Sequence, residues 1–209
     1  MGTRNLTIII KDNKIRLSQY GQWDGYFDYT GIRFLKFVKE NLQDKSIQGH
    51  KDFMARFAEK VDLLKPATDK YYKELVKATE SYYESNDELN KSKYVIPFSL
   101  MHPQFSRDTG VEILNVINRL HRFEFSRKFF PVFIVKNEDG MCEYANVINI
   151  DTDEIYMLTI HDFKGEPQTT CEVLENFDTG GMRCYFKSNI QSIPSIRACK
   201  KLVSEIGID

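Results

Sequence analysis

The hydrophobic pattern of the first twenty residues predicts a β-hairpin. Residues 6–10 are apolar or β-branched throughout, and residues 15–20 alternate apolar and polar side chains. Between them, Asp12 and Asn13 tolerate the positive φ that a tight turn requires. The nearly continuous apolar run in the first strand further predicts that this strand is buried on both faces of a sheet.

From residue 30 to about residue 85, the apolar positions recur with the period of a helix. Two stripes, separated by a short break, predict one helix up to Leu42 and a second one around residues 53–64. A third helix is expected to begin at Thr68 or Asp69. Lys and Glu are interleaved on the remaining positions, which is typical of helix faces exposed to solvent.

The next helix is expected to begin at Thr109, because residues 109–112 have the pattern of a capping box. In that motif the Thr109 hydroxyl accepts a bond from the third amide of the helix, and Glu112 reaches back to the first one. The chain also predicts a final helix after Pro194, since proline suits the first turn of a helix.

Between these helices the period falls to two, which predicts strands. Residues 131–136, 141–150 and 154–160 are expected to form an antiparallel meander. Residues 169–174 and 182–187 could add two further strands.

The order hairpin, helices, sheet, helix indicates an α+β fold, because strands and helices are segregated along the chain. No repeat or proline-glycine linker divides it, so residues 1–209 are expected to form a single domain. An isolated hairpin is marginally stable in water. We therefore expect the N-terminal hairpin to join the later meander in one sheet, with the helices packed on it.

Charge and cysteine usage exclude several classes of function. With 29 Lys and Arg against 30 Asp and Glu, the net charge is −1, which argues against nucleic-acid binding through bulk charge. No run approaches the roughly 20 apolar residues of a membrane span, and no signal-peptide core begins the chain.

The four cysteines form no CxxC pair, and the histidines are scattered. We expect a cytoplasmic protein with reduced thiols, no bound metal and no cofactor.

One basic segment has two possible explanations. Residues 119–128 carry three arginines, a histidine and a lysine around two phenylalanines. This segment could contact an acidic partner or nucleic acid, or it could be the solvated end of a helix whose phenylalanines point inward.

Two segments do not resemble ordinary packing sequence. Residues 20–26 (YGQWDGY) contain the only tryptophan of the chain, a carboxylate, an amide and two glycines. Glycines allow backbone to approach a ligand closely, and Trp and Tyr offer flat surfaces with a polar handle. The alternative is an aromatic-filled turn between a strand and a helix.

The second segment is residues 106–110 (SRDTG), at the expected start of a helix. A helix N-terminus beside an arginine can bind an anion. The alternative is that Asp108 and Thr109 only cap the helix and that Arg107 pairs with an acid elsewhere.

Together with residues 1–6 (MGTRNL) and 142–150 (CEYANVINI), these two segments resemble a protein family found in bacteriophages, bacteria and fungi. The resemblance extends from residue 2 to about residue 160 and is strong only in those short blocks. The family has no assigned activity, so the resemblance marks positions and implies one intact domain without implying a reaction.

The element order also loosely resembles that of the N-terminal-nucleophile hydrolases, which use a Cys, Ser or Thr at the mature N-terminus. This chain departs from them at that position, because Gly2 has no side chain. The analogy rests on element order alone.

The residues suggest a small-molecule site at one edge of the sheet, where loops gather. Two arginines would hold an anionic group, Asp24 or Asp108 would act as acid or base, and an indole would stack on the ligand. Hydrolysis of an amide or phosphoester bond is the reaction class we expect. The proposed site residues are Arg4, Tyr20, Trp23, Asp24, Arg107 and Asp108.

The alternative is a non-catalytic interaction protein of phage type that binds a host protein or sequesters a nucleotide signal. The sequence contains no recognised nucleophile, metal set or phosphate-binding loop. A protein of this kind needs a recognition surface rather than a reactive group.

Overall fold

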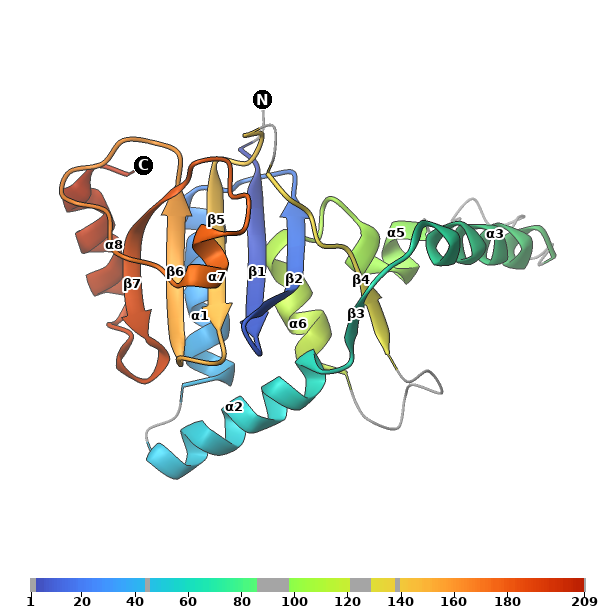
Figure 1. Ribbon diagram of the computed structural model, residues 1–209, viewed down its shortest axis with the longest axis horizontal. Helices are drawn as coiled ribbons and strands as arrows, with labels where there is room; N and C mark the ends of the chain where they lie inside the picture. Colours follow the sequence, from blue (N-terminus) through green and yellow to red (C-terminus); the bar gives the residue numbers. More distant parts are fainter. Residues whose placement is uncertain (1–2, 44–45, 86–97, 121–128, 138–139, 209) are drawn as a thin grey trace.

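The computed structural model describes the chain except for residues 1–2, 44–45, 86–97, 121–128, 138–139 and 209. Its centre is a five-stranded sheet in the order β2-β1-β5-β6-β7 (Figure 1). The strands are β1 (Asn5–Lys11), β2 (Lys14–Gly21), β5 (Tyr144–Asn149), β6 (Glu154–Thr159) and β7 (Arg183–Asn189). A separate pair is formed by β3 (Leu64–Pro66) and β4 (Phe130–Val132).

Helices cover the sheet and extend beyond one side of it (Figure 1). The α3 helix forms an arm that projects away from the sheet beyond β2. The α-helices are α1 (Ile32–Asn41), α2 (Ile47–Val61), α3 (Asp69–Ser85), α5 (Phe98–Met101), α6 (Ile113–Asn118), α7 (Glu172–Glu175) and α8 (Ile196–Ile206). Short π or 3₁₀ turns are η1 (Phe27–Gly31), η2 (Pro103–Phe105), η3 (Gly110–Glu112) and η4 (Ile190–Ser192).

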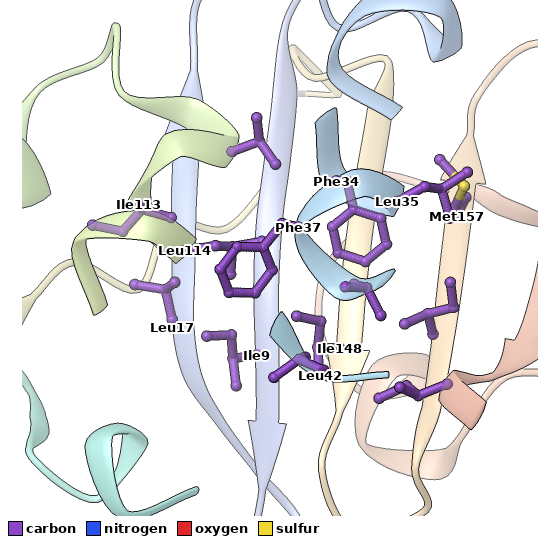
Figure 2. Close-up of a cluster of buried hydrophobic side chains, with 14 of the residues drawn as sticks. Ile9, Leu17, Phe34, Leu35, Phe37, Leu42, Ile113, Leu114, Ile148 and Met157 are labelled. Atoms are coloured by element: carbon purple, nitrogen blue, oxygen red, sulfur yellow. The ribbon is translucent and has the colours of Figure 1, made fainter. Parts of the chain in front are cut away.

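Both faces of the sheet are buried, as the apolar run in the first strand predicted. On one face, Ile9 and Leu17 pack in a cluster with Phe34 of α1 and Leu114 of α6 (Figure 2). On the other face, alternate residues of the same strands pack in a second cluster beneath α7. Each fully buried Ile or Leu contributes roughly 1.5–3 kcal/mol to the free energy of unfolding. The two clusters therefore stabilise the sheet from both faces.

The α+β class and the union of hairpin and later strands in one sheet are confirmed. The hairpin joins the sheet through β1, which pairs with β5 in parallel, from Asn5 opposite Tyr144 to Ile10 opposite Asn149. The remaining neighbours are antiparallel, so the sheet is mixed.

The strand predicted at residues 131–136 is shorter than expected and has another partner, and the strand predicted at residues 169–174 is wrong. Residues 131–136 do not join the meander, because β5 already has β1 and β6 as neighbours. Instead β4 pairs with β3, and a single bridge joins Ile134 to Ser18 of β2. Residues 169–174 form coil and the start of α7, whose Leu174 covers the second core cluster.

The predicted capping box at residues 109–112 is also wrong. Thr109 has helical backbone angles and makes no cap bond; its hydroxyl donates to the Pro103 carbonyl at 2.6 Å. The Glu112 side chain turns to Arg33 and Asn115 instead. At the third helix, by contrast, the Thr68 hydroxyl accepts a bond from the Tyr71 amide at 3.2 Å, as a cap should.

Within the part of the chain that the structure describes, no helix has the length and apolar character needed to span a bilayer. The polar segment that follows α3 and most of the basic segment at residues 119–128 lie outside the described residues.

Candidate functional site

The two conspicuous segments lie side by side at the edge of the sheet where β1 begins and β2 ends, at the top of Figure 1. The Gln22 amide donates to the Arg107 carbonyl at 2.8 Å. The Gln19 side-chain amide donates to the Ser106 carbonyl at 2.9 Å. These bonds anchor residues 106–108 against the end of β2.

Asn5 is the polar centre of this edge. Its side chain is 1% exposed and donates to the carbonyls of Gly21 at 3.4 Å and Trp23 at 3.3 Å. Because both partners are carbonyl oxygens, the atom that contacts them is the amide nitrogen Nδ2, and Oδ1 points away from these two carbonyls. Asn5 Oδ1 is buried and has no hydrogen-bond partner among the described residues.

The glycines of both segments are needed for this close packing. A Cβ on Gly21 would lie 2.7 Å from the Asn5 amide atoms. Gly110 has a φ of +47°, and a Cβ there would lie 3.4 Å from the Gly21 Cα. Glycine therefore allows both backbones to contact Asn5 and each other.

Trp23 and Asp108 connect the two segments through their side chains. The indole N–H of Trp23 donates to Asp108 Oδ1 at 3.0 Å, although the tryptophan is 55% exposed. Asp24 adopts a φ of +52°, and its carbonyl accepts a bond from the buried Thr30 hydroxyl. The turn from Gly21 to Thr30 is thus held at both ends.

Between these side chains lies a pocket of about 270 Å³, which we call the Trp23 pocket. Three carboxylates line it, together with two aromatic side chains, Asn5 and one guanidinium. That guanidinium, of Arg33, pairs with Glu112 at 3.2 Å and lies 4.3 Å over the Tyr29 ring. The lining residues are Asn5, Gly21, Gln22, Trp23, Asp24, Tyr29, Thr30, Arg33, Asp108, Thr109, Gly110, Val111 and Glu112.

The six predicted site residues fall into two groups. Trp23, Asp24 and Asp108 line the Trp23 pocket, whereas Arg4, Tyr20 and Arg107 are not among its lining residues. The structure therefore does not bring all six into one pocket.

The second group gathers around the Tyr20 hydroxyl, which donates to Gln22 Oε1 at 2.7 Å. Burial raises the pKa of Tyr20, while the positive charges of Arg4 and Arg107 act in the opposite direction. Arg4 Nε is buried and has no hydrogen-bond partner among the described residues.

Several pocket residues were missed by the sequence analysis, namely Asn5, Tyr29, Arg33 and Glu112. Asn5 could have been recognised in the sequence, because it is a polar residue directly before an apolar strand. Arg33 lies in a predicted helix and Glu112 was assigned to a capping box, and only the packing of η1 and α1 beside η3 brings both of them to Tyr29.

A larger cavity, of about 640 Å³, lies elsewhere, between the α3 arm, α5 and α6. Its walls are mainly apolar, and it contains none of the residues of the two conspicuous segments. The Trp23 pocket is smaller, but it contains the convergent polar groups that ligand recognition needs.

The cysteines and histidines supply no alternative site in the described part of the chain. All four cysteines are free, and burial raises the pKa of the Cys142 and Cys184 thiols to about 11, so that they stay protonated at neutral pH. No group of three or more His, Cys, Asp or Glu side chains with metal-site geometry occurs among the described residues.

Comparisons with protein-family models, with curated proteins and with solved structures give no match for this chain. The candidate site is a small pocket lined by Trp23, Asp24, Asp108 and Asn5, whose Oδ1 is buried and accepts no hydrogen bond from the described residues.

Proposed function

We propose that the Trp23 pocket binds a small cationic group, such as an alkylammonium or guanidinium group. The observation that carries this proposal is the excess of acceptors in its walls. Asp24, Asp108 and Glu112 supply carboxylates, and Asn5 supplies an oxygen that accepts no hydrogen bond from the described residues. A ligand with several N–H donors would satisfy these acceptors, and the buried Asn5 oxygen gains most, because an unmade buried bond costs about 1–3 kcal/mol.

The aromatic walls support the same ligand class. Trp23 and Tyr29 are each about half exposed, so their ring faces are accessible. A cation over such a ring is attracted to it by roughly 0.5–1 kcal/mol at an exposed site. Arg33 over Tyr29 is an example of this contact within the protein.

Trp23 allows a direct test, because it is the only tryptophan in the chain. Its fluorescence should change saturably on titration with agmatine or n-butylammonium. Inorganic phosphate and acetate at matched ionic strength should leave it unchanged. The apparent affinity for the cations should fall with added salt, since the charges are exposed.

Three variants sharpen this test. Asp24→Asn should weaken cation binding by removing one carboxylate, and Glu80→Gln on the exposed face of α3 is the matched control that should not. Arg33→Gln should strengthen binding several-fold, because Arg33 is the one cationic side chain among the described residues that line the pocket. If neither cation binds, or if Arg33→Gln weakens binding, the proposal is wrong.

A second candidate function is binding of an anionic ligand between Arg4 and Arg107. Arg4 Nε is buried without a partner, and the charges of Arg4 and Arg107 both act on Tyr20. A phosphate at this position would separate two like charges and accept bonds from both guanidinium groups. Saturable binding of phosphate that is lost in Arg107→Ala would support it, and turnover of a phosphoester or acyl amide that is lost in Asp108→Asn would support hydrolysis.

A further inference from the structure

A second small pocket lies beside the Trp23 pocket at the same edge of the sheet. It has a volume of about 270 Å³ and is lined by Tyr26, Glu143, Tyr144, His161, Gly207 and Ile208. We call it the Tyr26 pocket. None of these residues lines the Trp23 pocket.

The two pockets share the η1 turn as a wall. Tyr26 lines the second pocket, and its carbonyl accepts bonds from the amides of Tyr29 at 3.2 Å and Thr30 at 3.0 Å. Tyr29 and Thr30 both line the Trp23 pocket. One hydrogen-bonded turn, residues 26–30, thus contributes residues to both pockets.

The Tyr26 pocket also suits a cation. Glu143 Oε2 is paired with His161 Nε2 at 3.0 Å, and no hydrogen bond to Glu143 Oε1 is seen among the described residues. The Tyr26 and Tyr144 rings lie with their centroids 6.3 Å apart. A ligand would have to displace the His161 ring from Glu143 or lie beside it.

The C-terminus of α8 adds to this negative potential. The helix has eleven residues and ends at Gly207, a left-handed residue that lines the pocket. The carbonyl end of a helix carries a partial negative charge, which favours a nearby cation. The end of α8 lies at the same edge of the sheet as the start of β1 (Figure 1).

Pocket size and exposed aromatic side chains distinguish a protein partner from a free small molecule. Each pocket is smaller than the roughly 300–1,000 Å³ of a usual small-molecule site. Around them Trp23, Tyr26 and Tyr29 are 55%, 44% and 45% exposed. Trp and Tyr are the residues most enriched at the energetic centres of protein interfaces.

We propose that the two pockets together bind one extended segment of a partner protein, each pocket receiving one basic side chain of that segment. This inference rests on the proposed function for the first side chain and adds the second pocket. Two linked contacts bind more tightly than one, because the second binding event is intramolecular.

The test uses acetylated, amidated peptides with two arginines separated by zero to three glycines. Each is paired with a control peptide in which the second arginine is glutamine. Trp23 fluorescence and calorimetry give the affinities with the full chain. At one spacing, the two-arginine peptide should bind at least about tenfold more tightly than its control.

Variants assign that gain to the second pocket. Glu143→Gln should reduce the affinity to that of the control peptide, whereas Glu80→Gln should not. If no spacing gives a gain, or if the gain survives Glu143→Gln, this inference is wrong. Binding of the control peptides without a gain leaves the proposed function standing, and loss of all binding by the folded protein overturns both.

Discussion

Asp108 accepts a hydrogen bond from the Trp23 indole at 3.0 Å, across 85 residues of sequence. This contact joins the turn after β2 to the segment before α6, and it places the only tryptophan of the chain in the wall of a pocket lined by acids. The indole is therefore a built-in reporter of this pocket.

Two substitutions of Asp108 should separate the hydrogen bond from the charge. Asp108→Asn keeps an oxygen that can accept the indole bond, so the Trp23 emission should stay close to that of the wild type while agmatine binding weakens. Asp108→Ala removes the acceptor, and the emission should move toward that of a fully solvated indole. Equal agmatine affinity in wild type and Asp108→Asn would contradict the role assigned to the carboxylate.

Gly21→Ala should destabilise the protein by about 1–3 kcal/mol, as overpacking of a tight site does. The new Cβ would lie 2.7 Å from the Asn5 amide atoms. Urea unfolding of both single variants and the double variant gives the coupling. In an Asn5→Ala background the cost of Gly21→Ala should largely vanish, and an undiminished cost would show that the Asn5 contact is not its cause.

Deleting residues 1–20 should abolish cooperative unfolding. The deletion removes β1, which pairs with both β2 and β5 and whose residues Ile8, Ile9 and Ile10 are fully buried. A milder variant, Ile9→Ala, should lower the free energy of unfolding by about 2–5 kcal/mol and leave the transition cooperative. A sharp thermal transition in the truncated chain would show that the hairpin is not integral to the domain.

His50 should contribute strongly to stability at the opposite edge of the sheet. Its ring is buried between the Leu42 carbonyl, 2.9 Å from Nδ1, and Asp153 Oδ2, 2.6 Å from Nε2. His50→Ala should lower the free energy of unfolding by about 1–3 kcal/mol, because the Leu42 carbonyl loses its donor. The matched control is His161→Ala, which removes a half-exposed ring. This variant should change the free energy of unfolding by less than about 0.5 kcal/mol.

Asp153→Asn tests the same contact more gently. Asp153 has a φ of +58°, a conformation that asparagine also tolerates. The amide can still bond to the ring, so this variant should lose less stability than His50→Ala. A larger loss would mean that the carboxylate charge, rather than the hydrogen bond, holds α2 against the β5–β6 turn.

Stability should fall as the pH rises from about 9 to about 11. Burial raises the pKa of the Cys142 and Cys184 thiols from 9.0 to about 11 in the folded protein. The unfolded chain therefore releases these protons at lower pH than the folded chain, and the stabilisation present below pH 9 is lost through this window. Replacing both cysteines with alanine should reduce the loss of stability between pH 9 and pH 10 in a urea-midpoint profile. Above pH 10, Tyr185, whose pKa is also raised by burial, contributes to the loss as well.

Much of the fold could be predicted from the sequence, because the spacing of apolar residues follows directly from which side chains are buried. The apolar run at residues 6–10 predicted a strand buried on both faces, and β1 is such a strand. Residues 131–136 were misassigned because a short apolar run does not reveal its partner. Residues 169–174 were misassigned because Cys171 and Leu174, three apart, fit a helical turn as well as a strand.

The candidate site could be predicted only in part. Segments with unusual composition identified Trp23, Asp24 and Asp108, and these line one pocket. Arg4 and Tyr20 were assigned to the same site because they belong to the same edge, yet Tyr20 packs against the second core cluster. Which face of a strand a residue occupies depends on pairing register, which composition does not carry.

The central claim is that the Trp23 pocket binds a cation, and the indole N–H resonance of Trp23 tests it most directly. The chain has one tryptophan, so a ¹⁵N-labelled sample gives one such signal. On addition of agmatine the signal should shift saturably, and phosphate at the same ionic strength should leave it in place. If the signal does not shift with agmatine, or if it shifts with phosphate alone, the Trp23 pocket does not bind a cation as proposed.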